Sequence, residues 1–221
     1  MTDETVENGT QTVQNGGKTE NTTINNGGEQ DVYGTAKDTI INNGGKQDVP
    51  GTAKDTTIYQ GGLQYVSGTA KDTTIYQGGL QHVYSGGSAT GTTINNGGEQ
   101  DVSGTAKDTT INDGGKQYVY SGGSATGTTI NNGGKQDVPG TAKDTTIYQG
   151  GLQYVYSGGS ATGTTIYQGG LQHVYSGGSA TGTTINDGGE QDVSGIAKAT
   201  GTTINDGGKQ TVYSGGSVTN T

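Results

Sequence analysis

Apolar residues recur along this chain at fixed, long intervals instead of forming continuous runs. The repeating unit reads G-G-x-Q-x-V, then a turn, then A-x-x-T-T-I and two polar residues. Its valines are Val13, Val32, Val49, Val66, Val83, Val102, Val119, Val138, Val155, Val174, Val193 and Val212. Successive valines lie 17 or 19 residues apart, and such self-similarity at a fixed period is typical of a repeat architecture.

Within each unit the apolar and polar positions alternate, as in Gln81-x-Val83. A period of two, with many Thr, Val, Ile and Tyr residues, indicates strands, and the paired glycines indicate turns. Units of 17 and 19 residues differ only in the turn after Val, because Ala precedes Ile by five residues in both Ala89/Ile94 and Ala70/Ile75. We therefore predict an all-β fold: a right-handed parallel β-helix of about 12 coils that occupies residues 1–221 as a single domain.

The composition agrees with a thin solenoid core. The 221 residues include 46 Gly, 2 Pro and no Cys, and only 25% are hydrophobic. An average domain has roughly 45–50% apolar residues, so a thick two-layer core is excluded. In a solenoid each coil needs few inward side chains, because the coils above and below supply the remaining burial. We expect Val, Ile, Ala and the first Thr of each T-T pair to point inward, beside a ladder of stacked Gln amides.

Several functions are excluded by charge and by missing motifs. A net charge of −9 opposes binding to nucleic acid or anionic membranes. No stretch approaches the ~18 apolar residues of a spanning helix, so we expect no membrane insertion by this segment. The histidines, His82 and His173, occupy the same outward repeat position several coils apart, and no catalytic motif is present. We expect no enzyme activity, and no cofactor or metal, because the repeat lacks the third Gly and the Asp of calcium-binding β-rolls.

One outward face varies in sets of residues. The cassette Tyr-Gln-Gly-Gly-Leu occurs four times, and the other coils carry Asn-Asn or Asn-Asp before Gly-Gly and Glu or Lys after it. We expect apolar-aromatic patches separated by charged bands, which is a pattern of interaction sites. The candidate self-association face consists of Leu63, Leu80, His82, Tyr84, Leu152, Tyr154, Tyr156, Leu171, His173 and Tyr175. The alternative is that these rings only cover the sheet and stack coil on coil.

The unit at residues 85–102, S-G-G-S-A-T-G-T-T-I-N-N-G-G-E-Q-D-V, resembles the 19-residue repeat of AIDA-type self-associating autotransporter adhesins of Gram-negative bacteria. The resemblance extends from about Val6 to Val218. It implies a β-helical passenger domain at the bacterial cell surface that mediates adhesion, autoaggregation and biofilm formation. The implied partners are other copies on neighbouring cells and the host-cell surface. Some family members are also O-glycosylated by a dedicated heptosyltransferase.

The resemblance also implies candidate glycosylation sites in the S-G-G-S-A turns. The matching residues are Ser85, Ser88, Ser121, Ser124, Ser157, Ser160, Ser176, Ser179, Ser214 and Ser217. The short units depart from this pattern, since Ser67 stands alone and Pro50 and Pro139 replace Ser elsewhere, so we expect those coils to be poor acceptors. A degenerate first coil and an incomplete last coil lead us to expect a fragment of a longer passenger.

Two other functions stay open. The rod could be a structural spacer and a glycan-acceptor substrate of a heptosyltransferase, without self-association. A weaker alternative is an ice-binding solenoid with an outward rank of threonines at Thr93, Thr110, Thr129 and equivalent positions. The companion Thr of each pair has inward parity, however, which leaves a single rank of hydroxyl groups instead of a flat pair of ranks.

Overall fold

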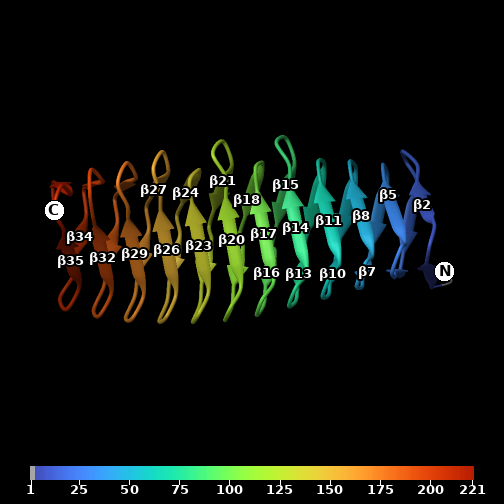
Figure 1. Cartoon of the computed structure of the whole chain (residues 1–221), viewed down its shortest axis with the longest axis horizontal. Helices are drawn as coiled ribbons and strands as arrows, with labels where there is room; N and C mark the ends of the chain where they lie inside the picture. Colours follow the sequence, from blue (N-terminus) through green and yellow to red (C-terminus); the bar gives the residue numbers. More distant parts are fainter. Residues whose placement is uncertain (1–2) are drawn as a thin grey trace.

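The computed structural model describes residues 3–221 as a rod of stacked coils with the chain termini at opposite ends (Figure 1). Each coil contributes one strand to each of three parallel sheets, and every sheet has 12 strands. Met1 and Thr2, which the predicted domain includes, lie outside the described residues. The predicted parallel β-helix is confirmed, and the part of the chain that the structure describes contains strands and turns but no helix.

Sheet A forms from the T-I end of each unit, where Thr points outward and Ile points inward. The pairing is in register, so that Ile58 lies beside Ile41 and Ile75. The strands are β1 (Glu4–Val6), β4 (Thr22–Ile24), β7 (Ile40–Ile41), β10 (Thr57–Ile58), β13 (Thr74–Ile75), β16 (Thr93–Ile94), β19 (Thr110–Ile111), β22 (Thr129–Ile130), β25 (Thr146–Ile147), β28 (Thr165–Ile166), β31 (Thr184–Ile185) and β34 (Thr203–Ile204).

Sheet B forms from the x-Q-x-V segment and faces the viewer in Figure 1. Its Gln and Val residues point inward, and its other two positions point outward. The strands are β2 (Thr10–Val13), β5 (Glu29–Val32), β8 (Lys46–Val49), β11 (Leu63–Val66), β14 (Leu80–Val83), β17 (Glu99–Val102), β20 (Lys116–Val119), β23 (Lys135–Val138), β26 (Leu152–Val155), β29 (Leu171–Val174), β32 (Glu190–Val193) and β35 (Lys209–Val212).

Sheet C follows the turn of variable length, and its central Ala points inward. The strands are β3 (Lys18–Glu20), β6 (Thr35–Lys37), β9 (Thr52–Lys54), β12 (Thr69–Lys71), β15 (Ser88–Thr90), β18 (Thr105–Lys107), β21 (Ser124–Thr126), β24 (Thr141–Lys143), β27 (Ser160–Thr162), β30 (Ser179–Thr181), β33 (Lys198–Thr200) and β36 (Ser217–Thr219).

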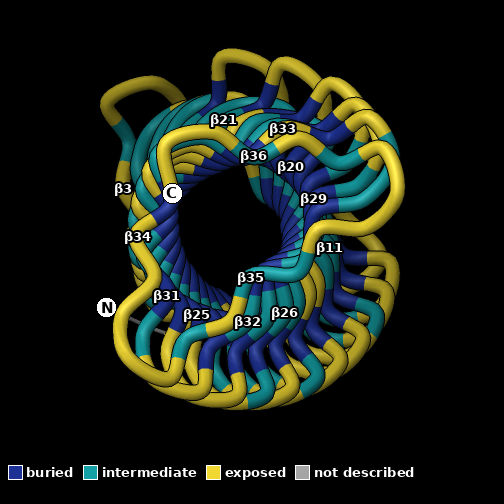
Figure 2. The backbone as a smooth tube through the Cα atoms, turned by 90° about the vertical axis from the view of Figure 1, so that its left-hand side faces the viewer, coloured by how far each residue is buried: buried dark blue, intermediate teal, exposed yellow. Residues whose placement is uncertain are grey.

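The core consists of columns of identical side chains. Ten isoleucines, from Ile24 to Ile185, are fully buried and form one continuous cluster. Columns of Val and Ala line the other two sheets, and almost all of these residues are buried. Figure 2 looks along the rod and shows the buried residues on the inner wall of the coil, with the exposed turns outside. Burial is continuous because each side chain is covered by its equivalents in the coils before and after it.

The inward glutamines form the predicted ladder along the axis. The Gln117 Nε2 donates to Gln100 Oε1 at 2.7 Å, and Gln136 Nε2 donates to Gln117 Oε1 at the same distance. Sequence analysis places the first Thr of each T-T pair inside the rod but does not anticipate its hydrogen bonds: Thr128 Oγ1 donates to Gln117 Oε1 at 3.3 Å. The buried amides are therefore paired along the axis and across the coil, as burial of a polar group requires.

The glycine pairs are required for two different reasons. Gly61 has a φ of +72°, a left-handed conformation that favours glycine. Gly62 has no room for a side chain, because a Cβ there would lie 2.6 Å from the Ile41 carbonyl oxygen of the coil before. The corner between sheets C and A is also left-handed, and there Asp72 (φ +53°) and Gly91 (φ +70°) are equivalent. Asp and Gly tolerate this region, which explains their exchange between units.

Replacing Gln117 by Met tests the ladder. Met keeps the length of the side chain but leaves Gln136 Nε2 without its Gln117 acceptor and removes the donor to Gln100. Gln136 Nε2 keeps its bond to Thr128 Oγ1, and Gln100 Oε1 keeps its bond from Thr109 Oγ1, so the cost is that of the lost hydrogen bonds. At about 0.5–1.5 kcal/mol each, the free energy of unfolding should fall by about 1–3 kcal/mol. Guanidinium unfolding measures the change, with the outward Thr129→Ala as control. Equal midpoints for Gln117→Met and wild type would contradict a stabilising ladder.

Candidate functional site on the outer face of sheet B

Two outward columns run along sheet B, because alternate residues of each strand point away from the core. The leucine column is made by the first residue of each strand from β5 to β35: Glu29, Lys46, Leu63, Leu80, Glu99, Lys116, Lys135, Leu152, Leu171, Glu190 and Lys209. The aromatic column is made by the third residue of the same strands: Asp31, Asp48, Tyr65, His82, Asp101, Tyr118, Asp137, Tyr154, His173, Asp192 and Thr211.

The four cassettes form two apolar patches, each two coils wide. Leu63 pairs with Leu80, and Leu152 pairs with Leu171, on adjacent strands. In the turn before these strands the tyrosines of each patch stack in parallel. The ring centroids are 5.2 Å apart both between Tyr59 and Tyr76 and between Tyr148 and Tyr167, and the four residues are 41–43% exposed. The stacked turn tyrosines therefore add exposed aromatic area to the leucine patches.

The aromatic residues of the candidate face gather in two clusters. In the first, His82 lies 4.4 Å from Tyr84 between ring centroids. The same cluster includes Tyr65, Tyr118 and Tyr120, which the sequence prediction does not include. In the second cluster, the ring centroid of Tyr175 lies 4.0 Å from that of His173, 5.2 Å from that of Tyr156 and 5.8 Å from that of Tyr154. The rings do stack coil on coil, and Tyr84 remains 43% exposed.

A histidine and an aspartate face each other twice on this sheet. His82 Nδ1 lies 3.7 Å from Asp101 Oδ2, and His173 Nδ1 lies 3.8 Å from Asp192 Oδ2. Burial raises the pKa of both carboxyl groups. Neither Oδ1 atom has a hydrogen-bond partner within the described residues. Sequence analysis does not identify these pairs, although their spacing of 19 residues, one coil, is the signal that could have found them.

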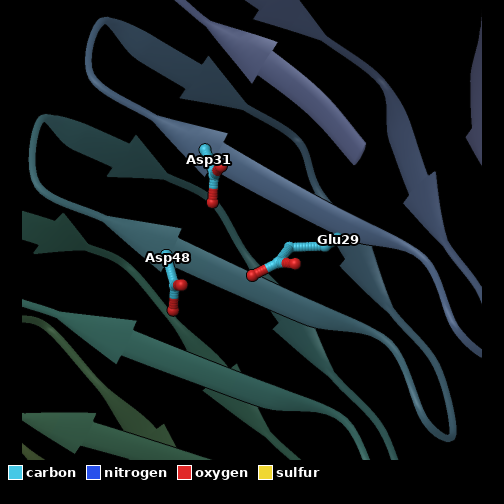
Figure 3. Close-up of side chains that lie close together, drawn as sticks. All are labelled: Glu29, Asp31 and Asp48. Atoms are coloured by element: carbon cyan, nitrogen blue, oxygen red, sulfur yellow. The ribbon is translucent and has the colours of Figure 1, made fainter. Parts of the chain in front are cut away.

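Near the N-terminal end, Glu29, Asp31 and Asp48 bring three carboxylates close together (Figure 3). The Lys46 ammonium occupies this cluster, at 2.8 Å from Glu29 and 2.6 Å from Asp48, and these contacts raise its pKa. The pKa of Asp31 is also raised, first by burial and then by the charges of Glu29 and Asp48. Because the Lys46 ammonium lies between Glu29 and Asp48 and offsets part of their charge, the arrangement is that of an ion-pair network.

The candidate acceptor serines occupy two kinds of position. Figure 1 shows the long turns before β15, β21 and β27 extending further than the short turns between them. The first serine of each S-G-G-S turn is exposed at the tip: Ser85, Ser121, Ser157, Ser176 and Ser214. The second serine begins a strand of sheet C, and except for the exposed Ser217 it is half-buried: Ser88, Ser124, Ser160 and Ser179. The tip hydroxyls are thus the more accessible group.

A short turn at Pro139 leaves a groove between long turns. Its volume is about 780 Å³, and its lining includes Tyr118, Pro139, Tyr156, Ser157 and Tyr175. The Tyr156 hydroxyl donates to Asp137 Oδ1 at 3.1 Å, and burial followed by the Asp137 charge raises the pKa of this tyrosine. The length of each turn therefore determines where a groove forms between the long turns that project from the rod.

The fold and this face together define a class: a non-globular β-solenoid repeat protein whose variable residues form an ordered outer surface. The family model described as "Adhesin of bacterial autotransporter system, probable stalk" matches residues 95–134 and 167–208. The crystal structure of a TibA fragment hyper-glycosylated by TibC is 44% identical, with a TM-score of 0.95, and the match covers 98% of this chain and 83% of that one. No curated protein matches significantly.

The chain therefore belongs to the AIDA-type autotransporter adhesins, as a segment of passenger repeats. Membership implies a location at the bacterial cell surface and the structural role of an adhesin stalk. Nowhere in residues 3–221 does the structure contain a helix long and apolar enough to cross a membrane.

Replacing Asp101 by Asn should raise the guanidinium midpoint at pH 7, because burial disfavours the ionised carboxylate. A native pKa above the unfolded value means that stability falls as pH rises through that range. The increase in the guanidinium midpoint caused by Asn should therefore be present at pH 7 and absent near pH 3. The matched control is Asp206→Asn, in an exposed turn, which should change neither midpoint. An Asp101→Asn protein that is less stable than wild type at pH 7 would contradict the expectation.

Proposed function

We propose that this segment mediates self-association of bacterial cells through the outer face of sheet B, and thereby autoaggregation, adhesion and biofilm formation. The observation that carries the proposal is the two-coil apolar patches, with their stacked tyrosines, set between bands of Lys, Glu and Asp. Exposed apolar groups rimmed by charge are a feature of interaction sites. The partners are other copies on neighbouring cells, and the same face is available to a host-cell surface.

The proposal is supported by the separation of this face from the core. Leucines and tyrosines at outward positions lie outside the buried Ile, Val, Ala and Gln columns that form the core of the rod. Repeats without cassettes place Glu, Lys or Asp at the same positions and keep the same fold, as in β5, β8 and β17. The fold therefore does not depend on apolar residues at these positions. The four leucines are half-buried and the turn tyrosines are exposed, and this accessible apolar area favours association.

A second candidate function is that of a spacer and glycan acceptor, with a heptosyltransferase as partner. Two observations favour it: the exposed serines at the tips of the long turns, and a solved relative that is hyper-glycosylated. Glycosylation and self-association involve different residues, so that the two roles are compatible. The ice-binding alternative has less support, since the first Thr of each pair, such as Thr92 and Thr109, is buried and only one rank of hydroxyl groups points outward.

Replacing Leu152, Tyr154, Tyr156, Leu171 and Tyr175 by Ser should abolish aggregation of cells that display the rod. The reason is that the substitutions remove the apolar area of the second patch while the core columns stay intact. Settling of a cell suspension measures the effect, and circular dichroism of the purified rod checks the fold. Unchanged settling of a folded variant would refute self-association through this face.

The matched control carries five substitutions on the outward side of sheet C: Thr105, Thr126, Thr141, Thr162 and Thr181 to Ala. It should settle like wild type.

Co-expression with an autotransporter heptosyltransferase should add sugar to this chain, and intact-mass measurement detects each addition. Alanine at the five turn-tip serines should remove most of the added mass, because these hydroxyls are the exposed ones: Ser85, Ser121, Ser157, Ser176 and Ser214. Alanine at Ser88, Ser124, Ser160 and Ser179 should remove less, because these residues are half-buried. The absence of any mass increment on the wild-type chain would exclude the acceptor role for that enzyme.

A further inference from the structure

The leucine column has a symmetric pattern of charges and leucines centred on Lys116. We compare residues that lie the same number of coils before and after Lys116. Each charged residue on one side has an oppositely charged residue at the same distance on the other side, and each Leu has a Leu. The corresponding pairs are Glu99 with Lys135, Leu80 with Leu152, Leu63 with Leu171, Lys46 with Glu190, and Glu29 with Lys209.

From this symmetry we infer that two copies of the chain pair antiparallel and face to face through sheet B, about a two-fold axis at Lys116. The inference rests on the proposed self-association and adds its orientation and register. A two-fold axis that lies in the interface, perpendicular to the rods, places each column opposite the same column of the second copy, running in the opposite direction. Ten of the eleven opposed positions then match opposite charges or leucines, and the exception is Lys116 facing its own copy.

The stacked turn tyrosines have the same symmetry. In this register Tyr59 lies opposite Tyr167 of the second copy, and Tyr76 lies opposite Tyr148. The other coils place Asn at the equivalent turn position, as at Asn112 on the axis. Each exposed tyrosine stack therefore meets another stack and no charged residue, which allows both to lose contact with water.

A parallel pair is disfavoured by the same residues. A two-fold axis along the rods would place the leucine column of one copy opposite the aromatic column of the other, coil by coil. Glu99 would then face Asp101, and Glu190 would face Asp192. The same register also places Lys46 opposite Asp48 and Lys135 opposite Asp137. Over the eleven coils the parallel pair has six like-charge and four opposite-charge contacts, against five and six in the antiparallel pair, so the charges favour the antiparallel orientation.

The aromatic column does not oppose this orientation strongly. It brings Asp48 opposite Asp192 and Asp101 opposite Asp137, which are like charges. Two of these carboxylates have a cationic partner on their own rod, which is Lys46 for Asp48 and Lys135 for Asp137. Asp101 and Asp192 face His82 and His173, which compensate their charge only when the imidazole is protonated. Of the remaining positions, Asp31 lies opposite Thr211, and the others bring aromatic rings opposite aromatic rings.

The area of the face indicates a weak pair whose strength comes from multiple copies. With strands about 4.8 Å apart and four residues of about 3.3 Å each, one coil offers about 65 Å², and eleven coils offer about 700 Å². Stable dimers bury about 800 Å² on each partner, so an isolated pair falls slightly short. Figure 2 shows the turns displaced progressively around the axis of the rod. Two rods related by a two-fold axis at Lys116 therefore approach most closely in the coils beside that axis. Many rods on one surface gain from avidity.

Charge exchange beside the axis tests the register. Glu99→Lys alone and Lys135→Glu alone should each reduce aggregation of rod-coated beads at least several-fold, because each places two pairs of like charges across the interface. A mixture of the two variants should aggregate like wild type, and so should the double variant Glu99→Lys/Lys135→Glu. The matched control is Glu99→Lys/Lys116→Glu, which has the same net charge but leaves Lys opposite Lys135, and it should stay impaired.

Failure of the mixture and of the double variant to recover would overturn the antiparallel register while leaving self-association standing. Wild-type beads that do not aggregate would instead count against the proposed function itself.

Spin-label distances provide a second readout that does not depend on affinity. The chain has no Cys, so Lys116→Cys and Lys209→Cys each introduce a single label site. In an antiparallel pair the two labels at Lys116 lie close together, and those at Lys209, five coils away, are separated by about 48 Å along the axis. Equal short distances at both sites would show a parallel pair and overturn the inference.

Discussion

Each coil of the rod is joined to the next by parallel strand pairing in which like side chains lie one above another, about 4.8 Å apart. Every other feature depends on this repeat of identical positions. It allows Ile to cover Ile and Val to cover Val, and it brings each Gln within 2.5–2.7 Å of the next, so that a buried amide finds its partner in the following coil. A chain with 25% hydrophobic residues can therefore bury a continuous core.

The same repeat separates folding from recognition. Alternation along sheet B places Gln and Val inside and leaves the first and third residues outside. Coils with Leu and Tyr outside and coils with Glu and Asp outside share one inner wall, and the outer pattern can change without loss of burial. The apolar and charged bands of this adhesin segment follow one another along the rod in a fixed order, and in the proposed pairing this order determines which residues lie opposite each other in the two copies.

The sequence predicts much of the fold because each inward residue type recurs in register, so the period alone aligns the strands. Gln81 and Val83 share parity, which correctly places both inside. Contacts between different positions are harder to predict. The hydrogen bonds from Thr92 and Thr128 to the Gln ladder connect separate sides of the coil, and the His82–Asp101 approach depends on side-chain direction. The left-handed corner at Asp72 is likewise set by the angle between two sheets.

By itself, the sequence determined the solenoid, its strand alternation, the positions of the turns and the face on which Leu, Tyr and His gather, because all of these follow from periodicity. Only the tertiary structure decided which outward residues are neighbours. It placed Tyr65 and Tyr120 in the same cluster as His82, set Lys46 among three carboxylates, and separated exposed turn-tip serines from half-buried ones. The physical reason is that these contacts depend on the distance and angle between coils, which a one-dimensional pattern does not contain.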